Sequence, residues 1–105
     1  DYVHVWDGLT PLNLPRGGNL RWSNEPPFPV TVRYRQPGER IRLPGRDIRH
    51  SVKKLLSESV PPWQRDTLPF VYNEQNELLA VGDVLISDTL SRFSSATLNW
   101  QPPSE

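Results

Sequence analysis

The chain has 105 residues, a length that supports one domain with a modest core. It contains no cysteine, which excludes disulfide bonds and thiolate metal sites and favours a reducing, cytoplasmic compartment. The formal net charge is zero and no apolar run is long enough to span a bilayer, so we expect no membrane partner.

The twelve prolines and six glycines divide the chain into short pieces. This pattern predicts a mainly β fold with one or two helices, an α+β class. Residues 2–6 alternate like a strand, with His4 facing outward. Residues 9–18 are expected to form an irregular or edge segment, because proline cannot donate to a central β ladder.

Residues 30–43 predict a β-hairpin that carries arginine on one face. Residues 30–35 alternate apolar and polar side chains, and residues 40–43 do the same after a Pro-Gly turn. If both strands bury their apolar side chains, the outer face holds Arg33, Arg35, Arg40 and Arg42. Opposed like charges cost up to about 1 kcal/mol per pair, so this quartet indicates a binding function. The structural alternative is a solvated face neutralised by acids from residues 66–105.

The next segment predicts an amphipathic helix that ends at Pro61-Pro62, with Asp47 as its N-cap. Its apolar stripe consists of Ile48, Val52, Leu55 and Leu56. The outer face is expected to hold Arg46, Arg49, His50, Lys53 and Lys54. Lys53 and Lys54 are expected nearer the C-terminal half of the helix, where the helix dipole favours cations. The dipole does not explain the presence of Arg46 and Arg49.

The remaining segments predict further strands. Residues 61–72 are typical of a short helical turn that leads into a strand, with Trp63 and Leu68 as packing residues. Residues 70–82 predict a hairpin that turns at residues 73–76, and residues 83–87 and 96–100 predict two more strands.

The charge is separated along the chain despite the zero total. Residues 16–54 carry ten basic and three acidic residues, whereas acids predominate in residues 66–105. A basic patch of this kind is typical of a surface that binds a polyanion such as nucleic acid, although charge runs are more commonly solvated surface.

No catalytic motif stands out in the sequence. His4 and His50 are the only histidines, and no phosphate-binding loop or carboxylate cluster occurs at ligand spacing. A hydrolase built on His50, beside Arg49 and Lys53, is the enzymatic alternative. Of the four tryptophans, Trp22 is the best candidate for stacking on a base.

Four motifs within residues 33–83 resemble the C-terminal domain of the tRNA(Ile)-lysidine synthases. In chain order they are RQPGERIRLPGR, HSVKKLL, VPPWQRDTLPFVY and ELLAVGD. The resemblance implies that residues 1–105 form a single tRNA-recognition domain on a small β-sandwich-like scaffold. That scaffold would be related to a domain of the phenylalanyl-tRNA synthetase β-subunit. The absence of Met, even at position 1, also predicts that the chain is a fragment of a longer protein.

The resemblance implies a parent enzyme that uses ATP to attach lysine to the wobble cytidine of tRNA(Ile). ATP, with Mg²⁺, and lysine would bind the parent's N-terminal domain, so we expect no cofactor and no catalysis in this chain. Its task would be to grip the acceptor stem. The expected tRNA-binding residues are Arg33, Arg35, Arg40, Arg42, Arg46, Arg49, Lys53 and Lys54. Further candidates are His50, Trp22 and Arg65, and Arg65 has a structural role as its alternative.

A second function is compatible with the same residues. The basic face would then dock on the other domains of the parent enzyme and hold them in position, without contacting RNA. Binding of tRNA by the isolated chain discriminates between these two interpretations.

Overall fold

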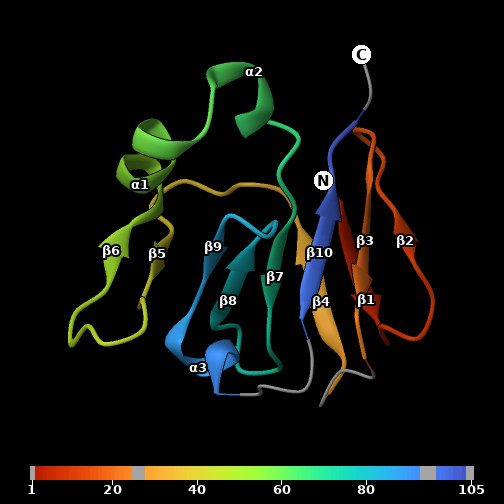
Figure 1. Ribbon diagram of the computed structural model, residues 1–105, viewed down its shortest axis with the longest axis horizontal. Helices are drawn as coiled ribbons and strands as arrows, with labels where there is room; N and C mark the ends of the chain where they lie inside the picture. Colours follow the sequence, from red (N-terminus) through yellow and green to blue (C-terminus); the bar gives the residue numbers. More distant parts are fainter. Residues whose placement is uncertain (1, 25–27, 93–96, 104–105) are drawn as a thin grey trace.

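The computed structural model describes residues 2–24, 28–92 and 97–103. Within these ranges the chain forms ten short strands and three short helices (Figure 1), which confirms the predicted mainly β fold. The strands are β1 (Val3–Trp6), β2 (Leu12–Asn13), β3 (Asn19–Trp22), β4 (Val30–Arg33), β5 (Arg40–Ile41), β6 (His50–Ser51), β7 (Phe70–Tyr72), β8 (Leu78–Val81), β9 (Leu85–Ile86) and β10 (Leu98–Gln101). The helices are α1 (Val52–Ser59), α2 (Pro62–Arg65) and α3 (Asp88–Ser91).

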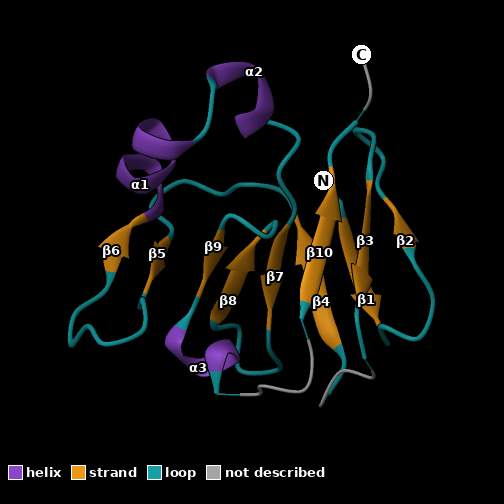
Figure 2. Cartoon of the chain, viewed as in Figure 1, coloured by secondary structure: helices purple, strands orange, loops and turns teal. Residues whose placement is uncertain are grey.

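The strands form three antiparallel sheets (Figure 2). The largest has five strands in the order β1-β4-β7-β8-β9, and the second has the order β10-β3-β2. The third is the pair β5-β6. Figure 1 shows β5, β6 and α1 at one end of the molecule and the three-stranded sheet at the other.

Large aromatic side chains hold the two larger sheets together. The rings of Trp6 in β1 and Trp22 in β3 stack with their centroids 6.2 Å apart. Trp100 in β10 lies against Gly82, where an added Cβ would come within 3.2 Å of the indole Cε3 atom. Both sheets contribute to one buried cluster, as expected of a β-sandwich-like domain.

A different layer extends this core at the other end of the five-stranded sheet. Ile41 of β5 is buried, as are Val52 and Leu56 of α1, and all three belong to the same apolar cluster. Their burial fixes α1 and the β5-β6 pair to the sheet.

The predicted hairpin between residues 30–35 and 40–43 is wrong. β4 pairs with β1 on one edge and with β7 on the other, so neither edge is free for β5. After β4 the chain crosses the upper end of the sheet (Figure 1), and β5 pairs with β6, where Arg40 faces Ser51. Arg35 therefore does not face Arg40 across a ladder, and the four arginines do not share one hairpin face.

The predicted helix starts later than expected. Its N-cap is Ser51, whose hydroxyl accepts a hydrogen bond from the Lys54 N–H at 3.4 Å, while Asp47 lies in a bend outside the helix. The residues just before the helix belong to β6, because the backbone of His50 pairs with that of Ile41. Tertiary pairing thus replaces the first predicted helical turn.

Two side chains predicted to pack in the core are exposed. Ile48 is 67% exposed in the loop between β5 and β6, and Trp63 is 71% exposed on α2, a four-residue helix with no buried residue. Val52, Leu56 and Leu68 are buried, as predicted.

Several further predictions of strands and their positions are confirmed. β7 and β8 form the hairpin, and the turn includes Asn76 at a φ of 63°. β2 lies at the edge of its sheet, and His4 is exposed. β9 lies within the predicted strand 83–87, and β10 overlaps the predicted strand 96–100, of which residue 96 lies outside the described residues.

Candidate nucleic-acid interface

Basic residues from separate segments line a surface hollow of about 540 Å³. The turn at Pro37 and Gly38 forms one wall, and the start of α1 forms another. Its basic lining residues are Arg16, Arg35, Arg40 and Lys53, and its acidic ones are Glu39 and Asp66. We call this the first hollow. Its positive charges outnumber its negative charges, so it is suited to an anion.

Arg16 is a lining residue that the sequence analysis did not single out. Its backbone N–H donates to the Tyr34 hydroxyl at 2.9 Å, and its guanidinium lies 4.2 Å above the Tyr34 ring. The guanidinium also donates to the Asp66 carbonyl at 2.8 Å. These contacts hold the loop after β2 against the end of β4. The one sequence signal was its place at the start of the basic segment 16–54.

The first turn of α1 is positively charged, which is unfavourable because the helix dipole is also positive at its N-terminus. Lys53 and Lys54 occupy the first turn, which contains no acidic residue. Cations at this end cost about 0.3–1 kcal/mol each, whereas an anion there is stabilised. The expectation that these lysines lie near the C-terminal half is therefore wrong, and their actual position favours an anionic partner.

A second hollow, of about 400 Å³, shares Gly38, Glu39 and Arg40 with the first hollow, and we call these three shared residues the ridge. All three ridge residues line both hollows. The opposite wall of the second hollow is the β7–β8 turn. Its basic lining residues are Arg40, Arg42 and Arg49, and its acidic ones are Glu39 and Glu77. The ridge residues thus belong to two hollows, and in each hollow the basic lining residues outnumber the acidic ones.

Most basic side chains that line the hollows form no ion pair within the described residues. Across the described residues, both ion pairs involve Asp88. Of the eight bases expected from the sequence to bind tRNA, six are exposed and take part in neither of these pairs: Arg35, Arg40, Arg46, Arg49, Lys53 and Lys54. Their charges remain available to a ligand.

Glu39 stands on the ridge between these bases. It is half-buried, and its Oε2 atom is enclosed without a hydrogen bond from the part of the chain that the structure describes. Burial raises the pKa of Glu39, and the positive charge of Arg33 partly opposes that rise. Its backbone carbonyl accepts a hydrogen bond from the Val52 N–H at 3.1 Å, which ties the ridge to α1.

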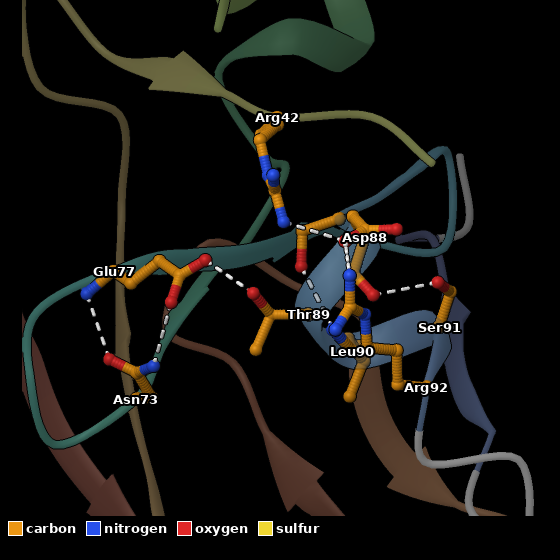
Figure 3. A network of polar contacts seen from close by, with 9 residues as sticks. Arg42, Asn73, Glu77, Asp88, Thr89, Leu90, Ser91 and Arg92 are labelled. Atoms are coloured by element: carbon orange, nitrogen blue, oxygen red, sulfur yellow. Dashed lines mark hydrogen bonds and ion pairs between the residues drawn. The ribbon is translucent and has the colours of Figure 1, made fainter. Parts of the chain in front are cut away.

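Two of the predicted binding arginines contact other parts of the protein. Arg42 Nη2 donates to Asp88 Oδ2 at 2.7 Å, and Arg92 shares that oxygen at 2.8 Å (Figure 3). Arg33 is half-buried, and its guanidinium lies 4.0 Å above the ring of Tyr72. The structural alternative raised from the sequence was that the arginines pair with acids from residues 66–105. Arg42 fits this alternative, because it pairs with Asp88.

A polar network stabilises the wall beside Arg42 (Figure 3). Glu77 Oε2 accepts a hydrogen bond from the Thr89 hydroxyl at 2.6 Å, and Glu77 Oε1 accepts one from Asn73 Nδ2 at 3.2 Å. These hydrogen bonds hold Glu77 in place, and the ion pairs with Arg42 and Arg92 hold Asp88. They do not neutralise the first hollow, which they do not line.

Arg46 and Arg49 lie in the loop between β5 and β6, so the predicted basic stripe along one helix is wrong. Only Lys53 and Lys54 of that set are on α1. His50 is half-buried in β6, and its Nε2 atom is enclosed with no hydrogen-bond partner from the described chain. This enclosure keeps one of the two ring nitrogens away from a substrate.

Arg65 and Trp22 have structural contacts. Arg65 Nε donates to the Val60 carbonyl at 2.9 Å and its Nη2 to the Ser57 carbonyl at 3.5 Å, which links α2 to the end of α1. Trp22 is half-buried against Trp6 and belongs to β3, at the end of the molecule opposite α1 (Figure 1).

The described ranges 2–24, 28–92 and 97–103 contain no group of three or more His, Cys, Asp or Glu side chains that could hold a metal ion. No helix in them has the length and apolar character needed to cross a membrane.

Comparison with known proteins shows consistent matches. The family model described as TilS substrate C-terminal domain matches residues 30–100. The tRNA(Ile)-lysidine synthase of Xanthomonas axonopodis pv. citri is 42% identical over 109 residues, which cover 96% of this chain and 24% of the relative. That of Xylella fastidiosa strain 9a5c is 38% identical over 112 residues, covering 96% and 25%. The chain therefore spans about a quarter of the length of these curated relatives.

A solved structure, described as the crystal structure of the TILS C-terminal domain, has the same fold. It superposes with a TM-score of 0.73 at 19% identity, covering 99% of this chain and 100% of the other.

The two packed sheets and the basic hollows define the class of the protein as a small, mainly antiparallel β domain with a polybasic surface. Within that class, the chain belongs to the TilS substrate C-terminal domain family. The resemblance drawn from residues 33–83 is thus confirmed.

Proposed function

We propose that this chain is the tRNA-binding domain of a tRNA(Ile)-lysidine synthase and that it grips the acceptor stem of tRNA(Ile). The relatives that match 96% of the chain carry that enzyme name, which supports the proposal. In this proposal the parent enzyme is cytoplasmic and uses ATP, with Mg²⁺, to attach lysine to the wobble cytidine. ATP and lysine bind a part of the parent that lies outside this chain.

The first hollow is the observation that carries the proposal. It combines three arginines with Lys53 and the start of α1, where backbone N–H groups and the dipole favour anions. The planar guanidinium of arginine binds phosphate through two parallel hydrogen bonds. A-form RNA presents phosphates beside a shallow minor groove, so a rigid basic surface is suited to recognition by shape.

The proposed tRNA-binding residues form two groups, according to whether each side chain is exposed or already held by an internal partner. Those that are exposed and outside both ion pairs are Arg35, Arg40, Arg46, Arg49, Lys53 and Lys54, and Arg16 joins them in the first hollow. Arg33 and Arg42 contribute less, because Tyr72 and Asp88 already hold them.

Titration of the chain with tRNA at several salt concentrations tests the proposal. The logarithm of the affinity is expected to fall linearly with the logarithm of the salt concentration, by about 0.7 to 0.9 per phosphate contacted. Lys53→Ala should weaken binding, whereas Arg92→Ala, which removes an exposed cation paired with Asp88, should not. Affinity that does not change with salt, or equal effects of the two variants, would contradict the proposal.

Docking on the rest of the parent enzyme is the second candidate function. It is favoured by β1, an edge strand of the five-stranded sheet on which Val3 is 61% exposed and Val5 is 71% exposed. Apolar side chains on an exposed edge strand are typically covered by another segment. If the isolated chain shows no binding of tRNA, this candidate replaces the first.

A further inference from the structure

The ridge residues Gly38, Glu39 and Arg40 line both hollows, and each hollow has more basic than acidic lining residues. Consecutive phosphates of a nucleic-acid strand are separated by one ribose. A strand that places neighbouring phosphates in the two hollows therefore carries the intervening ribose across the ridge, next to Glu39.

Glu39 has the wrong charge for a phosphate contact. An ionised carboxylate accepts hydrogen bonds and donates none, so it repels phosphate and requires a donor. Its Oε2 atom is enclosed and accepts no hydrogen bond from the described chain, while Glu39 as a residue lines both hollows. Along the interior of a sugar-phosphate backbone, the 2′-hydroxyl of RNA is the donor, and DNA has no equivalent group.

We propose that Glu39 accepts a hydrogen bond from a ribose 2′-hydroxyl and thereby makes this surface selective for RNA over DNA. The inference rests on the proposed function, because it needs RNA phosphates in both hollows. An acidic side chain that binds a ribose hydroxyl beside a phosphate site also occurs in dinucleotide-binding folds, so the chemistry has a physical precedent.

The surroundings of Glu39 strengthen such a bond. The carboxylate is half-buried, and its pKa is raised by burial, so in the free chain its charge lacks full solvation. A donor that approaches the carboxylate from a hollow compensates for that missing solvation. The competing interpretation is that Glu39 only balances the charge of Arg33, and it predicts an equal effect on every polyanion.

A pair of RNA probes separates these interpretations. One is a short RNA hairpin, and the other is the same hairpin with 2′-fluoro riboses, which retain the A-form helix and the phosphates but cannot donate. The unmodified chain is expected to bind the 2′-hydroxyl hairpin about tenfold more tightly, the effect of one hydrogen bond to a charged acceptor. For Glu39→Ala this ratio should fall to about one, because the carboxylate that accepts the hydrogen bond from the 2′-hydroxyl is removed.

Two further variants complete the experiment. Glu39→Gln keeps an acceptor oxygen in a side chain of the same shape, so it should retain part of the ratio and remain folded. Glu58→Ala removes an equal charge from an exposed position on α1 that lines neither hollow, and it should retain the full ratio.

The outcomes distinguish this inference from the function on which it rests. Equal affinity of the unmodified chain for the two hairpins, or an unchanged ratio in Glu39→Ala, overturns the role of Glu39 and leaves RNA binding intact. Failure of the unmodified chain to bind either hairpin overturns the proposed function as well.

Discussion

The guanidinium of Arg16 lies 4.2 Å above the ring of Tyr34, and the backbone N–H of Arg16 donates to the Tyr34 hydroxyl. One tyrosine thus binds both the main chain and the side chain of the same arginine. The contact places a cation from the loop after β2 beside the end of β4, in the first hollow.

Tyr34→Phe tests this contact. The ring and its cation–π contact remain, but the Arg16 N–H loses its acceptor, so we expect the free energy of unfolding to fall by about 1 kcal/mol. Urea denaturation measures the change. Tyr2→Phe is the control, because the Arg16 N–H donates to the hydroxyl of Tyr34 and not to that of Tyr2. Equal losses in the two variants would refute the role of the Tyr34 hydroxyl.

Arg35→Thr is expected to weaken tRNA binding without loss of stability. Arg35 is exposed in the first hollow and takes part in neither ion pair of the described chain, so its removal relieves repulsion from nearby cations. The thermal midpoint at low salt should be unchanged or slightly raised. The salt slope of binding should become shallower by about one phosphate contact.

Arg42→Thr is the comparison for that variant and should behave differently. It removes the 2.7 Å pair with Asp88, so we expect a loss of about 0.5–1 kcal/mol in unfolding free energy and a smaller loss of tRNA affinity. Melting curves and binding isotherms at two salt concentrations measure both effects. A destabilised Arg35→Thr variant with intact binding would show that Arg35 supports the fold and not the RNA.

Glu39→Gln should change how stability depends on pH. Burial raises the pKa of Glu39 above its ordinary value of 4.5, so the folded chain binds this proton more tightly than the unfolded chain. That contribution to stability is fully present below pH 4.5 and is lost as the pH rises through the higher folded-state pKa. The variant should therefore be more stable than the unmodified chain at neutral pH, with a difference that shrinks on acidification. Urea titrations at several pH values would show it, and a constant difference would refute it.

The isolated chain should form no lysidine when supplied with ATP, Mg²⁺, lysine and tRNA. The sequence contains no Gly-rich phosphate-binding motif of the kind that holds ATP. Mass spectrometry of nucleosides from the digested tRNA would detect the product. Its formation by the pure chain would show that catalytic groups lie within these 105 residues.

Local sequence patterns were sufficient to predict several individual strands and which of their side chains are buried. The alternation of residues 30–34 predicts which side of β4 faces the core, and Val30, Val32 and Tyr34 are indeed buried. The hairpin of β7 and β8 follows from two apolar runs around a short polar turn. These features depend on the period of side chains along one segment, which the sequence displays directly.

Strand pairing did not follow from local patterns. A short turn after β4 favours a hairpin with β5, but pairing with β1 and β7 occupies both edges of β4. Strand pairing also explains why α1 begins later than predicted. His50 belongs to β6, which pairs with β5, so it cannot be part of the helix. Pairing depends on which distant segment offers a free edge, and periodicity within one segment contains no such information.

The sequence by itself determined that positive charge is concentrated in residues 16–54. Only the tertiary structure decided which of these charges lie together. Contacts with Tyr34 place Arg16 in the same hollow as Arg35, whereas Arg42 forms an ion pair with Asp88. Glu39 lines both hollows. The number of charges is a property of composition. Their grouping is set by long-range contacts, because electrostatic energy depends on separation in space and not on separation along the chain.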